Sequence, residues 1–302
     1  MEKVRLSPTA VTLEAKCSLL FYLQTILKLP QKPGLGATLG TIAHLCLELL
    51  IKKRRKKTVE QVLAAKTIIG TSVEFLCRRQ LNKHNIYSEE NLDKLNGFIL
   101  TGLKNDFYCE GADKVLIEQK IQIESDNWIL SCRLDKIAIY PNKIKVIDLK
   151  SQKQKFSEEE LQNNFQSQCY SLAIWEKYGI IPDVEFLLLK FVREPWQKVK
   201  RFTKTELKGL RHTLDTIAEH VRTYDHKKAH SNIAAHDPSR HFVCKYFCSY
   251  KNDFIYYSLV DDEGKTIKSS FDSSDLKTGA GQAIIKRRHN GCVYWKKLNE
   301  SM

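Results

Sequence analysis

The chain has 302 residues, enough to bury a sizeable core as one large domain with attachments or as two small domains. Its 49 basic and 35 acidic residues give a net charge of +14, which suits a polyanionic partner such as nucleic acid, although a basic protein without such a partner is the alternative. Because no stretch is apolar over the length of a membrane span, the start lacks a signal-peptide pattern and nine cysteines are scattered, we expect a soluble, cytoplasmic protein with reduced thiols.

The N-terminal part predicts two helices. Apolar residues recur at helical spacing over residues 8–29, and a second apolar run begins near Thr38, after the loop QKPGLGATLG. His44 lies in this second run, beside Gly40, which leaves room for another backbone to approach. The pattern fits both a hydrogen-bonded core histidine and a metal ligand. We interpret the basic residues 52–57 as a solvated helix end able to contact phosphate, with a nuclear targeting signal as the alternative.

Residues 58–110 are predicted to form a helical insertion, because they show no strand-like alternation. Strand character begins at Val115, in VLIEQKIQI. Glu118 lies inside this run. It is either a further acid at a metal site or one member of a surface ion pair.

The stretch from Trp128 to Lys150 predicts a β-hairpin, because two runs of β-branched and aromatic residues flank a Pro-Asn pair that favours a turn. An even-length turn there places Ile137 opposite Val146 and Asp135 opposite Asp148 on one face. An odd-length turn would move Asp135 off that face.

Two facing carboxylates repel each other unless a cation lies between them, and carboxylate oxygens are ligands that hard divalent metals prefer. Lys150, two residues beyond Asp148, would then orient or deprotonate the water that attacks a phosphodiester. The alternative is a surface hairpin with its charges in solvent. Ile137 and Val146 argue against it, since they turn the same face toward a core.

A helix is predicted after the hairpin. Ser157 and Glu160 match a capping box, and the helix should run to about Tyr178. Gln166 and Tyr170 are four residues apart and therefore adjacent on its surface, where they either serve Lys150 and a phosphate or mark the edge of the core. The run VEFLLLKFV, residues 184–192, predicts a strand buried on both faces, and the order hairpin, helix, strand predicts an α/β fold with a mixed sheet.

The C-terminal part predicts a helix over residues 204–229, followed by the segment FVCKYFCSY. Cys244 and Cys248 alone are a weak metal signal, since a structural site needs four ligands. Residues 251–302 are predicted to form a basic extension that begins with a hairpin. No phosphate-binding loop of an ATP-driven motor is found.

These motifs, taken in order, resemble the RecB-like branch of the PD-(D/E)xK nucleases, which includes the nuclease domains of RecB and AddB and the CRISPR-associated RecB-like exonucleases. The resemblance covers about residues 9–250 and rests on LGTIAHLCLE, the acid at 118, CRLD, IDLK and QSQCY. It implies a restriction-endonuclease-like fold, with a mixed central β-sheet flanked by helices. The nuclease domain would span residues 1–250 and the extension residues 251–302.

The resemblance also implies roles for single residues. The implied ligands of Mg²⁺ or Mn²⁺ are His44, Glu118, Asp135 and Asp148. Lys150 would act on the attacking water, and Gln166 and Tyr170 would position Lys150 or the DNA backbone. The expected activity is that of a metal-dependent DNA exonuclease in recombination, repair or end processing, working with a helicase or recombination protein. A catalytically inactive DNA-binding or assembly module of the same fold is the alternative.

Family members that hold an iron-sulfur cluster have one cysteine in the first helix and three near the end of the domain. Cys17, Cys244 and Cys248 match three of these positions, but Phe254 stands where the last is expected. Cys292 lies far along the chain and could substitute only through a fold that the sequence does not reveal. The sequence therefore favours an incomplete remnant of the cluster site, and a redox-sensitive or cluster-containing scaffold is a further alternative function.

Overall fold

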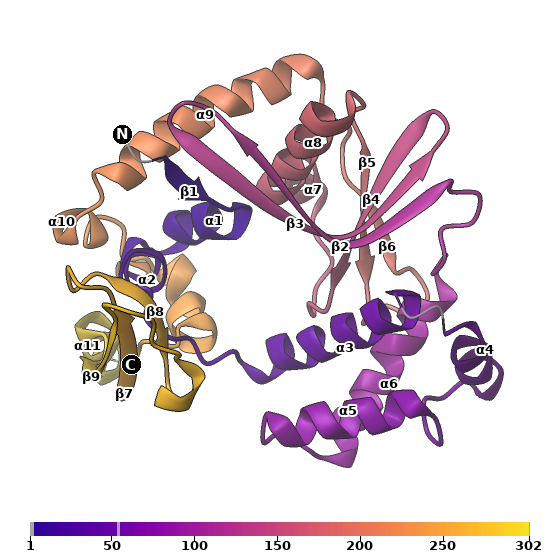
Figure 1. Ribbon diagram of the computed structural model, residues 1–302, viewed down its shortest axis with the longest axis horizontal. Coiled ribbons are helices and arrows are strands. Elements are labelled where there is room, and N and C mark those ends of the chain that lie inside the picture. The colour runs from indigo at the N-terminus through magenta and orange to yellow at the C-terminus, as the bar shows by residue number, and fades with distance from the viewer. Residues whose placement is uncertain (1–2, 53–54, 302) are drawn as a thin grey trace. The chain divides into compact units, whose positions relative to one another are not determined.

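A computed structural model describes residues 3–52 and 55–301 (Figure 1). The chain divides into two compact units, the first reaching up to Pro8 and comprising Leu35–Thr216, the second comprising Thr9–Gly34 and the chain from Ile217 onward. Every predicted metal ligand lies in the first unit, and the three cysteines of the predicted cluster remnant lie in the second. The predicted boundary at residue 250 concerns the extent of the nuclease domain and stays a prediction.

The first unit is built on a mixed β-sheet. Its strands are β1 (Val4–Leu6), β2 (Lys114–Glu124), β3 (Trp128–Tyr140), β4 (Lys143–Lys150), β5 (Asp183–Leu188) and β6 (Trp196–Lys198). β2 runs antiparallel along one edge of β3, while β1 and β4 pair with successive parts of its other edge, parallel and antiparallel respectively. β5 is parallel to β4, and β6 is antiparallel to β5. The mixed sheet flanked by helices confirms the predicted fold class.

The β3–β4 hairpin has the predicted register. Tyr140 pairs with Lys143 across a two-residue turn, and Ile137 pairs with Val146. Ile137 and Val146 are fully buried, so the hairpin does not lie open to solvent. Lys136 and Ile147 form the last ladder pair, and Asp135 and Asp148 come next in the same register.

A layer of helices packs on one face of the sheet (Figure 1). It contains α3 (Leu35–Lys52), α4 (Lys56–Ala65), α5 (Ser72–Lys83) and α6 (Glu89–Lys104). Their buried side chains share one core with Ala138, Ile147 and Leu149 of the sheet. The predicted helical character of residues 58–110 is thereby confirmed. Lys53 and Arg54, in the basic run 52–57, lie outside the described residues.

Helix α3 starts at Leu35, three residues before the predicted start. By length and composition alone it is apolar enough to cross a membrane, contrary to the reading of the sequence. It is instead a core helix, since Ile42, Ala43 and Cys46 on its inner side are almost completely buried against the rest of the first unit.

The helix predicted after the hairpin is in fact two helices, α7 (Glu158–Gln162) and α8 (Phe165–Tyr178). The capping box of Ser157 and Glu160 is present at the start of α7, and α8 ends at Gly179 as predicted. The break arises because the Asn164 side chain accepts a hydrogen bond from the Ser167 N–H and starts a new helix. Helix α8 lies against β2, β3 and β5.

Two helices predicted from the sequence, over residues 8–29 and 204–229, are interrupted in the structure. Residues 8–26 form α1 (Pro8–Lys16), α2 (Ser18–Phe21) and the π-helical turn η1 (Tyr22–Ile26), because the backbone is extended at Cys17. The helix predicted over residues 204–229 is α9 (Lys204–Arg222), which begins in the first unit, followed by the separate α10 (His226–Ala229). Asp225 caps the start of α10, which explains the interruption.

The end of the chain folds into a three-stranded antiparallel sheet. Short turns η2 (Ala234–His236), η3 (Pro238–Arg240) and η4 (Val243–Phe247) lead into β7 (Asp253–Val260), β8 (Thr266–Ser270), η5 (Ser273–Asp275), β9 (Ala283–Asn290) and α11 (Val293–Ser301). β7 is the central strand, with β8 and β9 on either side. The predicted hairpin is the β7–β8 pair, which is confirmed.

Candidate active site

The first unit has a backbone irregularity where β2 and β3 carry their acidic residues. Cys132 faces α8, where its thiol contacts the Cys169 carbonyl, whereas Lys136 faces the helical layer and donates to the Phe107 carbonyl at 2.8 Å. Residues four apart in a regular strand share a face, so the alternation of side chains reverses between these two positions. Asp135 lies at the reversal.

Glu118 lies opposite Asp135 on β2. Its φ of +52° is uncommon for a residue with a side chain and costs about 1–3 kcal/mol. Neither residue takes part in the β2–β3 ladder, which pairs the residues on either side of them. Because the backbone is irregular here, the side chains of Glu118 and Asp135 do not follow the regular alternation of side chains along β2 and β3.

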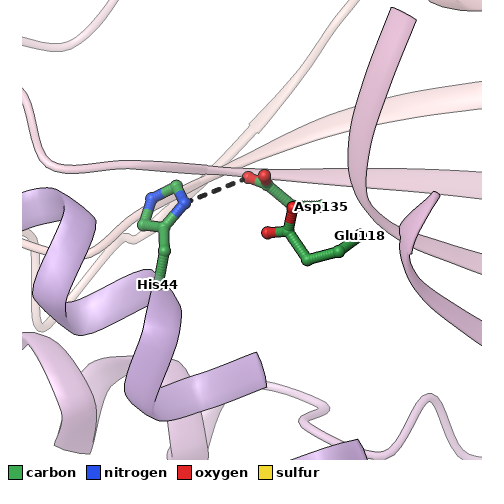
Figure 2. Close-up of side chains that lie close together, drawn as sticks. All are labelled: His44, Glu118 and Asp135. Carbon is green, nitrogen blue, oxygen red and sulfur yellow. Dashed lines mark ion pairs between the residues drawn. The ribbon is translucent and has the colours of Figure 1, made fainter. Parts of the chain in front are cut away.

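His44 joins these two carboxylates from helix α3. Figure 2 shows its imidazole ring reaching toward the carboxylates of Asp135 and Glu118, and its Nδ1 lies 3.6 Å from Asp135 Oδ2. One ligand atom from each of the three residues lies within 4.8 Å of the others. Burial acts to lower the pKa of His44, but the close contact with Asp135 and the charge of that carboxylate raise it above its usual value.

Glu118 forms the ion pair that was one of its two expected roles, and it is also placed among the candidate metal ligands. Its Oε2 lies 2.5 Å from the Nε of Arg133, in an ion pair, while the same side chain belongs to the group with His44 and Asp135. Arg133 is largely exposed, with 74% of its side chain accessible, so solvent screens the pair. The ion pair therefore leaves the carboxylate available to a cation.

A second group of side chains adjoins the first at the end of β4. Asp148 Oδ1 lies 3.0 Å from the Tyr170 hydroxyl and 3.3 Å from Gln166 Nε2. Lys150 Nζ donates to Gln166 Oε1 at 2.8 Å and lies 2.6 Å from Asp148 Oδ2. The four residues singled out on the hairpin and on the following helix are thus brought together in one network.

Of the side chains in this network, Asp148 has the surroundings least favourable to its charged form. Burial, partly offset by the charge of Lys150 and reinforced by that of Asp135, raises the pKa of its carboxyl group. Its Oδ2 is completely buried and accepts no hydrogen bond of good geometry, although the Lys150 ammonium is close. The Lys150 ammonium compensates the charge of this oxygen, and a bound divalent cation would supply the directed contact that it lacks.

The two groups touch through Asp135. Its Oδ2 accepts a hydrogen bond of 2.8 Å from the backbone N–H of Leu149, the residue between Asp148 and Lys150. Asp148 itself is not among the three residues whose ligand atoms lie within 4.8 Å of one another. Of the four predicted ligands, three therefore form one cluster, and the fourth lies beside it in the lysine network.

The donor set fits a hard divalent metal. An imidazole nitrogen and carboxylate oxygens suit Mg²⁺ or Mn²⁺, and the buried Oδ2 of Asp148 is an additional donor within the same region. His44, Glu118 and Asp135 line a cavity of about 20 Å³, which is room for one body the size of a water molecule. The residues present could hold an ion of this class.

Two residues near the site were missed by the sequence analysis. Glu48 lines the same cavity, and its place four residues after His44 on α3 is a signal that would have found it. Arg133 pairs with Glu118, which only the strand pairing reveals. Gly40 does allow a close approach, but the neighbour is a side chain and not the backbone that was expected, since a Cβ there would lie 2.2 Å from Ser151 Oγ.

Residues 5–252 match the family model described as the PD-(D/E)XK nuclease superfamily. A comparison with curated proteins finds no significant match. Among solved structures, a proposed exonuclease from Eubacterium rectale is 8% identical, with a TM-score of 0.45 and coverage of 72% of this chain and 80% of that one. Protein VC1899 from Vibrio cholerae is 11% identical, with a TM-score of 0.25 and coverage of 67% of this chain and 58% of that one. The family match spans both groups of site residues.

Proposed function

The chain belongs to the PD-(D/E)XK nuclease superfamily, and from this premise we propose that it is a Mg²⁺- or Mn²⁺-dependent deoxyribonuclease of the RecB-like branch. One observation carries the proposal: Gln166 Oε1 and Asp148 Oδ2 together hold Lys150 Nζ at the end of β4, the strand next to that of Asp135. A protein that only bound DNA would gain nothing from two adjacent acids and a lysine in one partly buried site, because the acids repel the phosphate backbone.

The proposed chemistry is water attack on phosphorus. A bound divalent ion supplies Lewis-acid stabilisation of the phosphoryl oxygens and lowers the pKa of water. The residues that would hold it are His44, Glu118, Asp135 and Asp148. Lys150 would donate a hydrogen bond to the attacking water and orient its lone pair. Gln166 fixes the position of Lys150 Nζ, because its amide oxygen accepts from the lysine while its amide nitrogen lies 2.5 Å from the Tyr170 hydroxyl.

The substrate in this proposal is DNA, and the mode of action is exonucleolytic. The net charge of +14 favours a phosphate backbone, and the order of the motifs from His44 to Tyr170 resembles that of the RecB-like branch. We place the protein in recombination, repair or end processing in the cytoplasm. Its partner in this proposal is a helicase or recombination protein, which would supply any unwinding of the DNA.

Labelled DNA tests the proposal directly. Linear duplex, single-stranded and covalently closed circular DNA are incubated with Mg²⁺, with Mn²⁺ or with chelator, using the wild type, Asp148→Asn and Lys150→Gln. Lys145→Gln is the matched control, because Lys145 is on the same strand but pairs with Glu185 at 3.2 Å. We expect metal-dependent degradation of linear DNA by the wild type and the control only. A wild type that leaves every substrate intact would favour the inactive DNA-binding module, and cleavage of closed circles would contradict exonuclease action.

A further inference from the structure

The three-stranded sheet of β7, β8 and β9, the terminal sheet, begins where the family match stops. The match ends at residue 252, and β7 starts at Asp253. Asp253 is the only acidic residue in the three strands, which carry four basic residues, Lys268, Lys286, Arg287 and Arg288. The other acids of this part of the chain lie in the connecting segments, at positions 261–263, 272 and 275. The strands are therefore basic and lie outside the residues that match the nuclease family.

One side of the terminal sheet is buried and the other is open. Tyr256 and Ser258 of β7 are almost completely buried, and Tyr256 belongs to a core of the second unit. Because side chains alternate along a strand, Ile255 and Tyr257 point to the opposite side. Ile255 is 52% exposed there, and Tyr257 is partly exposed. An apolar and an aromatic side chain thus lie two residues apart on an open sheet surface.

Basic residues of the neighbouring strands surround these two side chains. Residues directly opposite each other on antiparallel strands share a face. Arg288 of β9 lies opposite Ile255, and Lys286 lies opposite Tyr257. Both basic residues are exposed. On the other side of β7, β8 adds Lys268 to this face, because the partner of Lys268 is two residues from Tyr257. These five residues form the outer face of the terminal sheet.

Two further lysines reach the β8 edge from the first part of the second unit. Lys28 Nζ donates to the carbonyl of Thr266, the first residue of β8, at 3.2 Å. Lys32 Nζ lies 4.9 Å from the ring centroid of Phe271, which follows the last residue of β8. Positive charge therefore lies along both edges of the terminal sheet.

The acid at the start of β7 leaves most of this charge uncompensated. Asp253 pairs with Arg288 at 2.9 Å, but their side chains are 57% and 68% exposed, so solvent screens the pair. Among the residues that the structure describes, neither Lys268 nor Lys286 forms an ion pair. Their ammonium groups can therefore meet an anionic ligand.

We propose that the outer face of the terminal sheet binds single-stranded DNA. Proteins that bind single strands combine a basic surface along the backbone with aromatic side chains on which bases stack. Lys286 and Arg288 are two residues apart on β9, about 7 Å, which suits successive phosphates of an extended strand. Tyr257 lies beside them and offers its ring to a base. A duplex keeps its bases stacked inside, so the aromatic side chain favours an unpaired strand.

The choice of DNA as the ligand rests on the proposed function, but the face itself is separate from the candidate active site. None of its five residues belongs to that site, which lies in the first unit. A second copy of the chain is the other occupant that an exposed isoleucine and tyrosine could attract. Lysine and arginine on the same face argue against it, because two copies of a basic face repel each other.

Fluorescence anisotropy with a labelled DNA single strand tests the proposal, with chelator present so that no cleavage occurs. Tyr257→Ala is expected to weaken binding about fivefold or more, because a stacked base is lost. The double variant of Lys286→Gln with Arg288→Gln should reduce the slope of log affinity against log salt concentration by about 1.4, since each phosphate contact of a single strand contributes about 0.7. Melting temperatures check that each variant is folded, and the charge variant, on an exposed edge strand, carries the test if Tyr257→Ala does not fold.

Two controls keep the net charge and the ring separate from the location. The double variant of Lys296→Gln with Lys297→Gln removes the same charge from exposed positions on α11. Tyr257→Phe keeps the aromatic ring on the outer face. Both proteins should bind the strand as the wild type does, with the same salt dependence. An equal loss of affinity and slope in the α11 variant would overturn the proposal, because only the net charge would then matter.

The same measurement with duplex DNA and with RNA of the same sequence decides the class of ligand. Tighter binding of either one than of the DNA single strand would overturn the proposal. So would a wild type that sediments as a dimer while Tyr257→Ala sediments as a monomer, since the outer face would then hold a second copy. Cleavage of DNA by a protein whose binding ignores these substitutions would count only against this inference. Binding that depends on the outer face, without cleavage in Mg²⁺ or Mn²⁺, would leave it standing and count only against the proposed function.

Discussion

Lys150 and Asp148 form an ion pair of 2.6 Å at the end of β4, in which the carboxylate is almost fully buried and the ammonium is about one-fifth exposed. Removing one member of a buried pair normally destabilises a protein strongly, because a buried charge is left behind. Here the acid also faces the charge of Asp135, so its own burial is unfavourable. The two residues of the pair should therefore respond differently to substitution.

Asp148→Asn is expected to abolish cleavage while leaving the protein as stable as the wild type, or more stable by about 1 kcal/mol, when no metal is present. The amide keeps the shape and removes a buried charge that repels Asp135. Added Mn²⁺ should raise the melting temperature of the wild type more than that of the variant. Thermal unfolding with and without Mn²⁺ measures this difference, and an equal metal response in both proteins would remove Asp148 from the ligand set.

Tyr170→Phe is expected to lower the free energy of unfolding by about 1–3 kcal/mol, because the Asp148 carboxylate and the Arg133 carbonyl lose the hydroxyl that lies 3.0 Å from each. DNA cleavage should fall as well, since Gln166 loses the contact that orients it. Tyr178→Phe, at the end of the same helix, is the control and should change the unfolding free energy by less than about 0.5 kcal/mol. Urea unfolding compares the two, and equal effects would rule out a special role for the Tyr170 hydroxyl.

The parts of the site that the sequence could predict are those that follow from regular geometry. An even-length turn at Pro141-Asn142 predicted that Ile137 pairs with Val146, and helical spacing predicted that Gln166 is adjacent to Tyr170. The reversal of alternation at Asp135 could not be predicted, because it depends on packing against helices on both faces of the sheet. The same holds for Glu118, whose positive φ nothing in its sequence neighbourhood indicates.

Of the helix ends, one was predicted from the sequence and one was missed. Gly179 was predicted as a stop because glycine readily adopts a positive φ, and the break at Asn164 was missed because asparagine is also tolerated inside helices. Cys17 and Cys292 line one cavity of the second unit, and local reasoning could not have predicted this because the two residues are far apart in the sequence. Long-range contacts of this kind leave no periodic pattern in a sequence.

Glu118→Gln separates the two roles of the strained glutamate. If the carboxylate is a ligand, the loss of its charge should weaken Mn²⁺ binding about 10- to 100-fold, whereas Arg133→Gln breaks the same ion pair and leaves the ligand in place. Because Arg133 is mostly exposed, its replacement should cost less than about 1 kcal/mol of stability. Titration calorimetry with Mn²⁺ on both variants decides the matter. Equal and small effects on affinity would reduce Glu118 to a member of a surface ion pair.

Gly40→Ala tests whether the packing of α3 on the end of β4 controls the site. The new methyl group would lie 2.2 Å from Ser151 Oγ and 3.1 Å from Ser151 Cβ, so the hydroxyl must rotate away and the helix must shift slightly from the end of β4. Overpacking of this kind costs about 1–3 kcal/mol. Because Ser151 directly follows Lys150, the shift should also displace the lysine and reduce cleavage.

Gly36→Ala is the matched control on the same helix, since its Cβ would meet nothing within 4 Å. That change should stabilise the protein by about 0.5–1 kcal/mol, because alanine loses less backbone entropy than glycine in a helix. Combining Gly40→Ala with Ser151→Gly removes the clashing hydroxyl and should restore most of the lost stability and cleavage. If the double variant is no better than Gly40→Ala alone, the contact between α3 and Ser151 does not set the position of Lys150.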